Sequence, residues 1–131
     1  MLGVEVRSVV TPDDEHVNEV RLSGRVSGEP QGRELPSGDR LLSVRIVVPR
    51  PPHRRRGRGA TVDTIDCVAW TSRPRAVLAA MRVGDIVLVE GALRRRFWRG
   101  QHGLASKMEV DVSRAKRIRK AASQRAESKE G

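Results

Sequence analysis

Residues 84–98 read GDIVLVEGALRRRFW, and the order of these residues predicts a long β-strand with two different faces. Successive side chains of a strand point to opposite sides, so every second residue lies on the same face. One face contains Val87, Val89, Gly91 and Leu93. The other contains Arg94, Arg96 and Trp98. A solvated strand edge would account for the arginines but not for a tryptophan in register with them, so we expect this second face to bind a partner.

Working outward from this stretch, alternating apolar residues predict three strands before it and one after it, at residues 20–26, 42–48, 61–70 and 108–112. Between the third and fourth strands a helix is expected. Thr71 or Ser72 can cap it, Pro74 falls in its first turn, and Gly84 ends it. Residues 100–103 form the turn of a hairpin that joins the last two strands.

Three strands, one short helix and two more strands make the element order of an all-β, five-stranded OB-fold barrel. We expect an N-terminal extension over residues 1–16 and the barrel over residues 17–113. Residues 50–59 contain five arginines and no aliphatic side chain, which predicts a mobile basic loop. Residues 114–131 lose the alternation and predict a basic, flexible tail.

The charge balance favours a polyanionic partner. The 131 residues include 26 Lys and Arg against 16 Asp and Glu, a net charge of +10. No apolar run approaches the ~20 residues of a membrane span. The N-terminus carries Glu5 and Arg7 and lacks the apolar stretch of a secretory signal, so we expect a cytoplasmic, nucleoid-associated protein. Cys67, the only cysteine, is expected to be a core thiol.

Three segments carry a family resemblance. They read NEVRLSGRV at residues 18–26, LPSG at residues 35–38, and the stretch at residues 84–98 quoted above. Together and in this order they resemble bacterial single-stranded DNA-binding proteins, over about residues 17–118. The resemblance implies an OB-fold that binds single-stranded DNA largely without sequence preference, in replication, repair or recombination, usually as a homotetramer.

The resemblance also implies roles for individual residues. Trp98 matches a tryptophan on which bases stack, Trp70 replaces a stacking phenylalanine, and Arg94 and Arg96 match basic residues beside the strand. The alternation independently places these four side chains on outward faces. The remaining candidate phosphate contacts are the outward Arg21 and Arg45 and the loop residues Arg54, Arg55, Arg56 and Arg58.

The sequence departs from the family pattern at three places. A tryptophan that the family commonly has after its second strand falls in the arginine loop, and another early in the third strand is Thr64. The acidic C-terminal tip through which relatives recruit other proteins does not match the ending AESKEG, so such recruitment is not expected. These departures predict a specialised paralogue that relies more on charge than on rings.

The sequence also allows other functions to be compared with single-strand binding. A two-metal nuclease would draw on Asp63, Asp66, Glu90 and Asp111, but Asp63 and Asp66 have opposite strand parity and no catalytic motif surrounds them. The histidines and Cys67 lack metal-ligand spacing, so no enzyme activity, metal or cofactor is expected. Two alternatives stay open: an RNA-binding OB module, and a partner subunit of a related single-strand binder.

Overall fold

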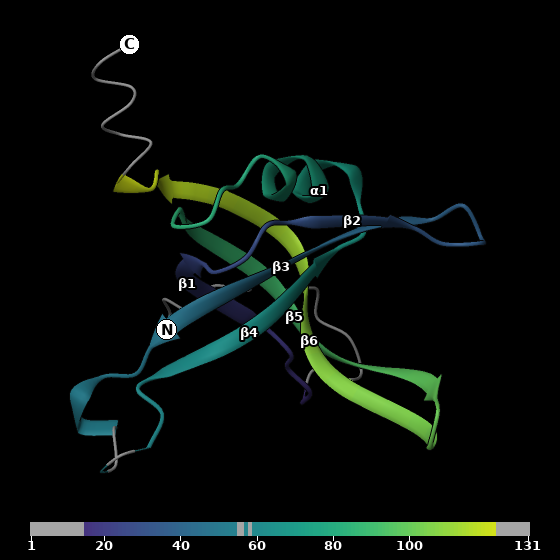
Figure 1. The fold of residues 1–131 in the computed structure, drawn as a ribbon, viewed down its shortest axis with the longest axis horizontal. Coiled ribbons are helices and arrows are strands. Elements are labelled where there is room, and N and C mark those ends of the chain that lie inside the picture. Colours follow the sequence, from purple (N-terminus) through teal and green to yellow (C-terminus); the bar gives the residue numbers. More distant parts are fainter. Residues whose placement is uncertain (1–14, 55–56, 58, 123–131) are drawn as a thin grey trace.

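The fold is described from a computed structural model, for residues 15–54, 57 and 59–122. These residues form six strands, one short 3-10 helix and one α-helix (Figure 1). In chain order they are β1 (Val20–Val26), β2 (Gln31–Glu34), β3 (Arg40–Pro49), η1 (Pro52–Arg54), β4 (Val62–Ala69), α1 (Ser72–Ala79), β5 (Ile86–Gly100) and β6 (Gly103–Arg119).

The strands close into a ring. The sheet order is β1-β5-β6-β4-β3-β2, and β1 also pairs with β3, where Val26 lies opposite Ile46. All pairings are antiparallel except that of β4 with β6, where Cys67 lies opposite Val110. A five-stranded ring with a helix between its third and fourth members is the OB-fold, which confirms the predicted fold class. β2 adds a sixth strand outside the ring, at the edge of the sheet next to β3.

The core fills this ring with small and β-branched side chains. Val26, Ile46, Cys67, Val87 and Val89 are all fully buried. Leu78 of α1 is also fully buried and belongs to the same cluster, so the helix covers part of the core.

Thr71 is the N-cap residue of α1, as expected. The helix was expected to end at Gly84, but α1 ends at Ala79, because the N–H groups of Ala80 and Met81 bond to carbonyls only three residues back. Gly84, with a φ of +98°, lies in the turn before β5.

A β-bulge bends the long β5–β6 hairpin. Glu90 lies opposite Arg114 and Gly91 lies opposite Val112, so Ser113 has no counterpart on β5. The backbones approach closely here, since a Cβ on Gly91 would lie 1.9 Å from the carbonyl oxygen of Asp111. Val110 and Asp111 of β6 still pair with β4, and beyond them the hairpin projects from the ring (Figure 1). We call residues 93–108 the arm.

A buried carboxylate fixes the other end of the same hairpin. Asp85 is fully buried and accepts hydrogen bonds from the backbone N–H groups of Arg82 (2.9 Å) and Ala121 (2.8 Å). It also pairs with Arg117 of β6 at 3.2 Å. Burial by itself raises the pKa of Asp85, but these hydrogen bonds and the Arg117 charge outweigh it and hold the pKa below its ordinary value.

Three further expectations differ from the structure. β2 was not predicted, because its sequence QGRE is polar and entirely exposed and therefore shows no alternation. The barrel was expected to end at residue 113, but β6 continues to Arg119, because residues 114–119 pair with β5 although their side chains are mostly charged. Leu93 shares a face with Val87 and Val89, yet it is 42% exposed because it lies on the arm.

The described part of the chain contains no helix long and apolar enough to cross a membrane.

Candidate nucleic-acid interface

The outward face of the sheet carries a hollow of about 460 Å³, which we call the first hollow. Its lining comes from β2, β3, β4, β5 and β6, and it brings together three of the predicted residues, Arg45, Trp70 and Arg96. Val68 of β4 also lines it and is 4% exposed. Residues distant in sequence therefore meet at one surface, as the alternation in each strand predicts.

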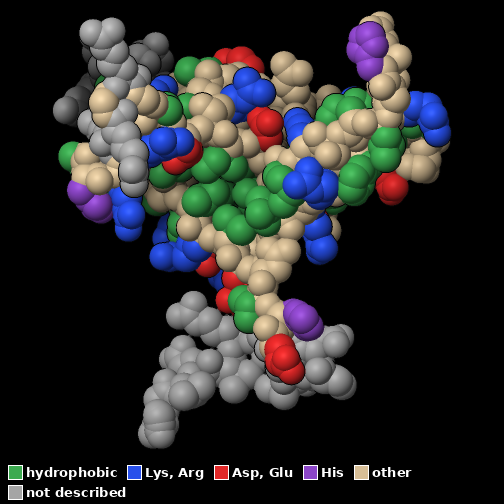
Figure 2. Space-filling model, turned by 90° about the horizontal axis from the view of Figure 1, so that it is seen from below, with side chains coloured by type: hydrophobic (Ala, Val, Ile, Leu, Met, Phe, Trp, Pro, Cys, Tyr) green, Lys and Arg blue, Asp and Glu red, His purple; other side chains and the backbone are tan. Residues whose placement is uncertain are grey.

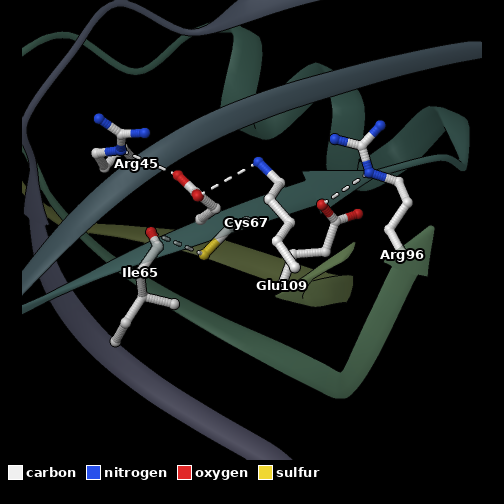
Figure 3. Close-up of polar contacts among 7 residues, drawn as sticks. Arg45, Ile65, Cys67, Arg96 and Glu109 are labelled. Carbon is white, nitrogen blue, oxygen red and sulfur yellow. Dashed lines mark hydrogen bonds and ion pairs between the residues drawn. The ribbon is translucent and has the colours of Figure 1, made fainter. Parts of the chain in front are cut away.

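Carboxylates pair with the cations of the first hollow (Figure 3). Asp66 accepts a hydrogen bond from Arg45 Nε at 2.9 Å and another from Lys107 Nζ at 3.4 Å. Burial works against ionisation of Asp66, but the Arg45 hydrogen bond and the Lys107 charge together lower its pKa below the ordinary value. Glu109, only 4% exposed, accepts a hydrogen bond from Arg96 Nε at 3.2 Å.

The two tryptophans both reach solvent. Trp98 is 42% exposed, and the guanidinium carbon of Arg96 lies 5.5 Å from the centroid of its ring. This is within the range of a cation–π contact, which holds the ring and the charge side by side. Trp70 follows the end of β4, is half-buried, and lines the first hollow. Neither ring is sealed in the core, so both remain available for stacking.

Arg21 and Arg94 lie in a second hollow, over β1, β5 and β6. Arg94 shares the outward face of β5 with Arg96, but it pairs with Asp111 at 3.5 Å. Arg21 pairs with Glu90 at 3.5 Å. The predicted site residues are thus divided between two hollows that share only the strands β5 and β6, and most of their charges already have a carboxylate nearby.

The basic loop is described only in part. Arg54 ends η1 and is exposed. Arg50 pairs with Asp63 at 2.7 Å, which raises the pKa of Arg50 and lowers that of Asp63, chiefly through the hydrogen bond between them. Arg55, Arg56 and Arg58, which were predicted to hold the nucleic-acid backbone, lie outside the described residues.

The carboxylates of the nuclease alternative are occupied by ion pairs rather than gathered together. Asp63 pairs with Arg50, Asp66 with Arg45 and Lys107, and Glu90 and Asp111 with other arginines. Over residues 15–54, 57 and 59–122, no group of three or more His, Cys, Asp or Glu side chains could hold a metal ion.

Sequence reasoning missed Lys107, Glu109 and the position of Asp66 between two cations. The alternation of β6 contained the signal: Met108, Val110 and Val112 occupy one face, so Lys107 and Glu109 must share the other with Asp111. Cys67 is fully buried as expected, and burial, with Asp66 and Glu109 adding to the effect, raises the pKa of its thiol to about 12. Its Sγ lies 4.0 Å from the carbonyl oxygen of Ile65 (Figure 3).

Comparison with known proteins shows the family to which the chain belongs. A sequence model of the single-strand binding protein family matches residues 17–118. The chain belongs to the single-strand binding protein family. The match begins before β1 and ends in β6, so the ring, both hollows and the arm lie within it.

Individual members of this single-strand binding family agree. A single-stranded DNA-binding protein of Oceanobacillus iheyensis is 32% identical over 87 residues, which are 66% of this chain and 53% of that protein. One from Deinococcus radiodurans is 33% identical over 88 residues, 66% of this chain and 29% of that protein. The chain thus spans about half the length of the first relative and less than a third of the second.

A solved structure described as a Plasmodium falciparum SSB complex with ssDNA superposes with a TM-score of 0.64, at 21% identity. The superposition covers 79% of this chain and 95% of the other. It supports the OB-fold found here.

Proposed function

We propose that this protein binds single-stranded DNA largely without sequence preference and catalyses no reaction. The observation that carries the proposal is the exposed Trp98 ring with the Arg96 guanidinium 5.5 Å from its centroid, next to the hollow that Trp70 lines. An unstacked nucleotide offers the apolar face of its base to such a ring and its phosphate to such a cation. The family membership and the names of the relatives support the same assignment.

Stacking on an aromatic side chain contributes about 1–3 kcal/mol per base, so two indoles account for about 2–6 kcal/mol per subunit. The remainder is assigned to phosphate contacts, from Arg21, Arg45, Arg94 and Arg96 and from the loop arginines 54, 55, 56 and 58. Each neutralised phosphate steepens the dependence of log affinity on log salt by about 0.7 for a single strand. A site with few rings and many arginines is therefore expected to be strongly salt-sensitive.

The wider setting is part of the proposal. By resemblance to the family we infer a homotetramer acting in replication, repair or recombination, in the cytoplasm and associated with the nucleoid. The net charge of +10 supports association with a polyanion.

The test is a fluorescence titration with oligo-dT of increasing length at two salt concentrations. Replacing Trp70 by Phe leaves Trp98 as the only indole, and we expect oligo-dT to quench its emission. The reciprocal Trp98→Phe variant reports on Trp70. Absence of quenching in the Trp70→Phe protein would remove Trp98 from the site, and failure of the unaltered protein to bind dT would refute the function.

Three further experiments address the alternatives. Competition with poly-U distinguishes an RNA-binding module, mass measurement of the purified protein distinguishes a partner subunit, and cleavage of a labelled oligonucleotide with Mg²⁺ or Mn²⁺ would indicate an enzyme.

Replacing the loop residues Arg54, Arg55, Arg56 and Arg58 by Ser should flatten the dependence of log affinity on log salt. An unchanged slope would exclude the loop from phosphate binding.

A further inference from the structure

The arm has a second exposed face, on the side opposite Trp98. Phe97 is 58% exposed on β5, and the pairing of Arg95 with Met108 and of Arg99 with Leu104 places these four side chains on the same face as Phe97. Leu104 is 72% exposed and Met108 is 41% exposed. This face, defined by the residues just named and called the Phe97 face, therefore offers an aromatic ring between two arginines.

The two faces of the arm differ in how their charges are balanced. On the Trp98 face each cation has a carboxylate partner: Arg94 pairs with Asp111 (3.5 Å), Arg96 with Glu109 (3.2 Å) and Lys107 with Asp66 (3.4 Å). On the Phe97 face, within the part of the chain that the structure describes, neither arginine pairs with a carboxylate. Arg95 donates a hydrogen bond to Ser106 Oγ at 3.1 Å, which leaves its charge uncompensated.

We propose that the Phe97 face is a second contact surface for single-stranded nucleic acid, in which a base stacks on Phe97 and phosphates pair with Arg95 and Arg99. This inference rests on the proposed function and extends it from one face of the arm to both. Exposed Leu104 and Met108 flank the ring and would shield the apolar edge of a stacked base. Adjacent residues of a β-strand point to opposite sides of the sheet. A nucleic-acid strand that contacts both Trp98 and Phe97 must therefore pass around the arm.

Charge decides between nucleic acid and a second copy of the chain as the occupant. Packing this face against the same face of another copy would bring four arginines together without an acidic residue from either face, and like charges in contact are repulsive. A phosphodiester supplies the missing negative charge. Figure 2 shows basic side chains (blue) next to hydrophobic ones (green) on one face of the molecule.

The first test replaces Phe97 by Leu, which removes the ring and keeps an apolar side chain. We expect oligo-dT to bind about 5- to 150-fold more weakly, the fold-change that corresponds to about 1–3 kcal/mol for one stacked base. Quenching of tryptophan emission at saturation and the oligomer mass should stay unchanged. Ile118→Ala is the control, because Ile118 is a 53%-exposed apolar residue of β6 outside the arm.

The second test removes the charges by the double substitution Arg95→Gln and Arg99→Gln. The slope of log affinity against log salt should fall by about 1.4, or 0.7 for each lost phosphate contact. The control is Arg73→Gln with Arg75→Gln, which makes the same change in net charge on α1.

The outcomes separate the possibilities. If the Phe97→Leu protein binds dT as tightly as the Ile118→Ala protein while the unaltered protein binds normally, the proposal of a second contact surface is wrong and the proposed function stands. If Phe97→Leu instead lowers the oligomer mass, the Phe97 face is an interface between copies and the inference is overturned. If the unaltered protein binds no dT, the proposed function and this inference both fall.

Discussion

Asp66 holds two cations of the first hollow, and neutralising it should strengthen nucleic-acid binding rather than weaken it. Arg45 lies 2.9 Å from one carboxylate oxygen and Lys107 lies 3.4 Å from the other. A phosphate entering the hollow must compete with this carboxylate for both cations. The substitution Asp66→Asn removes the competing charge and retains the shape of the side chain.

The expected gain follows from how exposed these pairs are. The side chains of Arg45 and Lys107 are 59% and 38% exposed, so water screens both contacts and each ion pair contributes only about 0.2–1 kcal/mol. Removing both competitors should stabilise the complex by about 0.4–2 kcal/mol, or about 2- to 30-fold in affinity. Any additional phosphate contact should steepen the salt dependence by about 0.7.

The measurement is a dT titration at several salt concentrations near neutral pH, where the lowered pKa of Asp66 keeps its carboxylate ionised. Asp39→Asn is the matched control, because it changes the net charge by the same amount. Asp39 lies in the exposed turn between β2 and β3, where its carboxylate accepts a hydrogen bond from the Ser37 hydroxyl. If Asp66→Asn binds no more tightly than Asp39→Asn, the carboxylate does not compete with phosphate and the reasoning fails.

Two further predictions concern stability. Gly91→Ala should lower the free energy of unfolding by about 1–3 kcal/mol or more, because the new Cβ would meet the Asp111 carbonyl oxygen. Gly28→Ala is the control and should change the free energy of unfolding little, because a Cβ there meets nothing within 4 Å. Equal denaturation midpoints for the two variants would contradict this prediction. Asp85→Asn should cost about 1–3 kcal/mol at neutral pH. Because the folded pKa of Asp85 lies below its ordinary 3.8, its contribution is complete above about pH 4 and is lost as the pH falls through the folded value. The difference between the two proteins should therefore shrink in acid, and a constant difference from pH 7 to pH 2 would exclude this carboxylate as the cause.

The ring and its core could be predicted because they depend on alternation, which a single sequence shows directly. Val44 and Ile46 lie on either side of the polar Arg45, and Val87 and Val89 share one face of the strand predicted within residues 84–98. All four side chains are buried as expected. Strand parity also placed Arg96 and Trp98 together, 5.5 Å apart in the structure. These features need no knowledge of which strands are neighbours.

The remaining features depend on pairing between distant segments. β2 is polar on both faces and is recognisable only by its register with β3. The ion pair between Arg96 and Glu109 forms because β5 and β6 are adjacent, and the bulge at Glu90 and Gly91 sets the register on which such contacts depend. Loss of alternation after residue 113 suggested a tail because the sequence does not show that Arg117 reaches Asp85.

The burial of Cys67 has a practical consequence for experiments on the arm. The thiolate is the nucleophile in alkylation, and a fully buried thiol with a pKa of about 12 supplies almost none at neutral pH. A cysteine introduced at exposed Gln101, in the tip of the arm, would then be the one reactive thiol of the folded protein. A maleimide dye or spin label attached there could report on the arm with the native cysteine left in place.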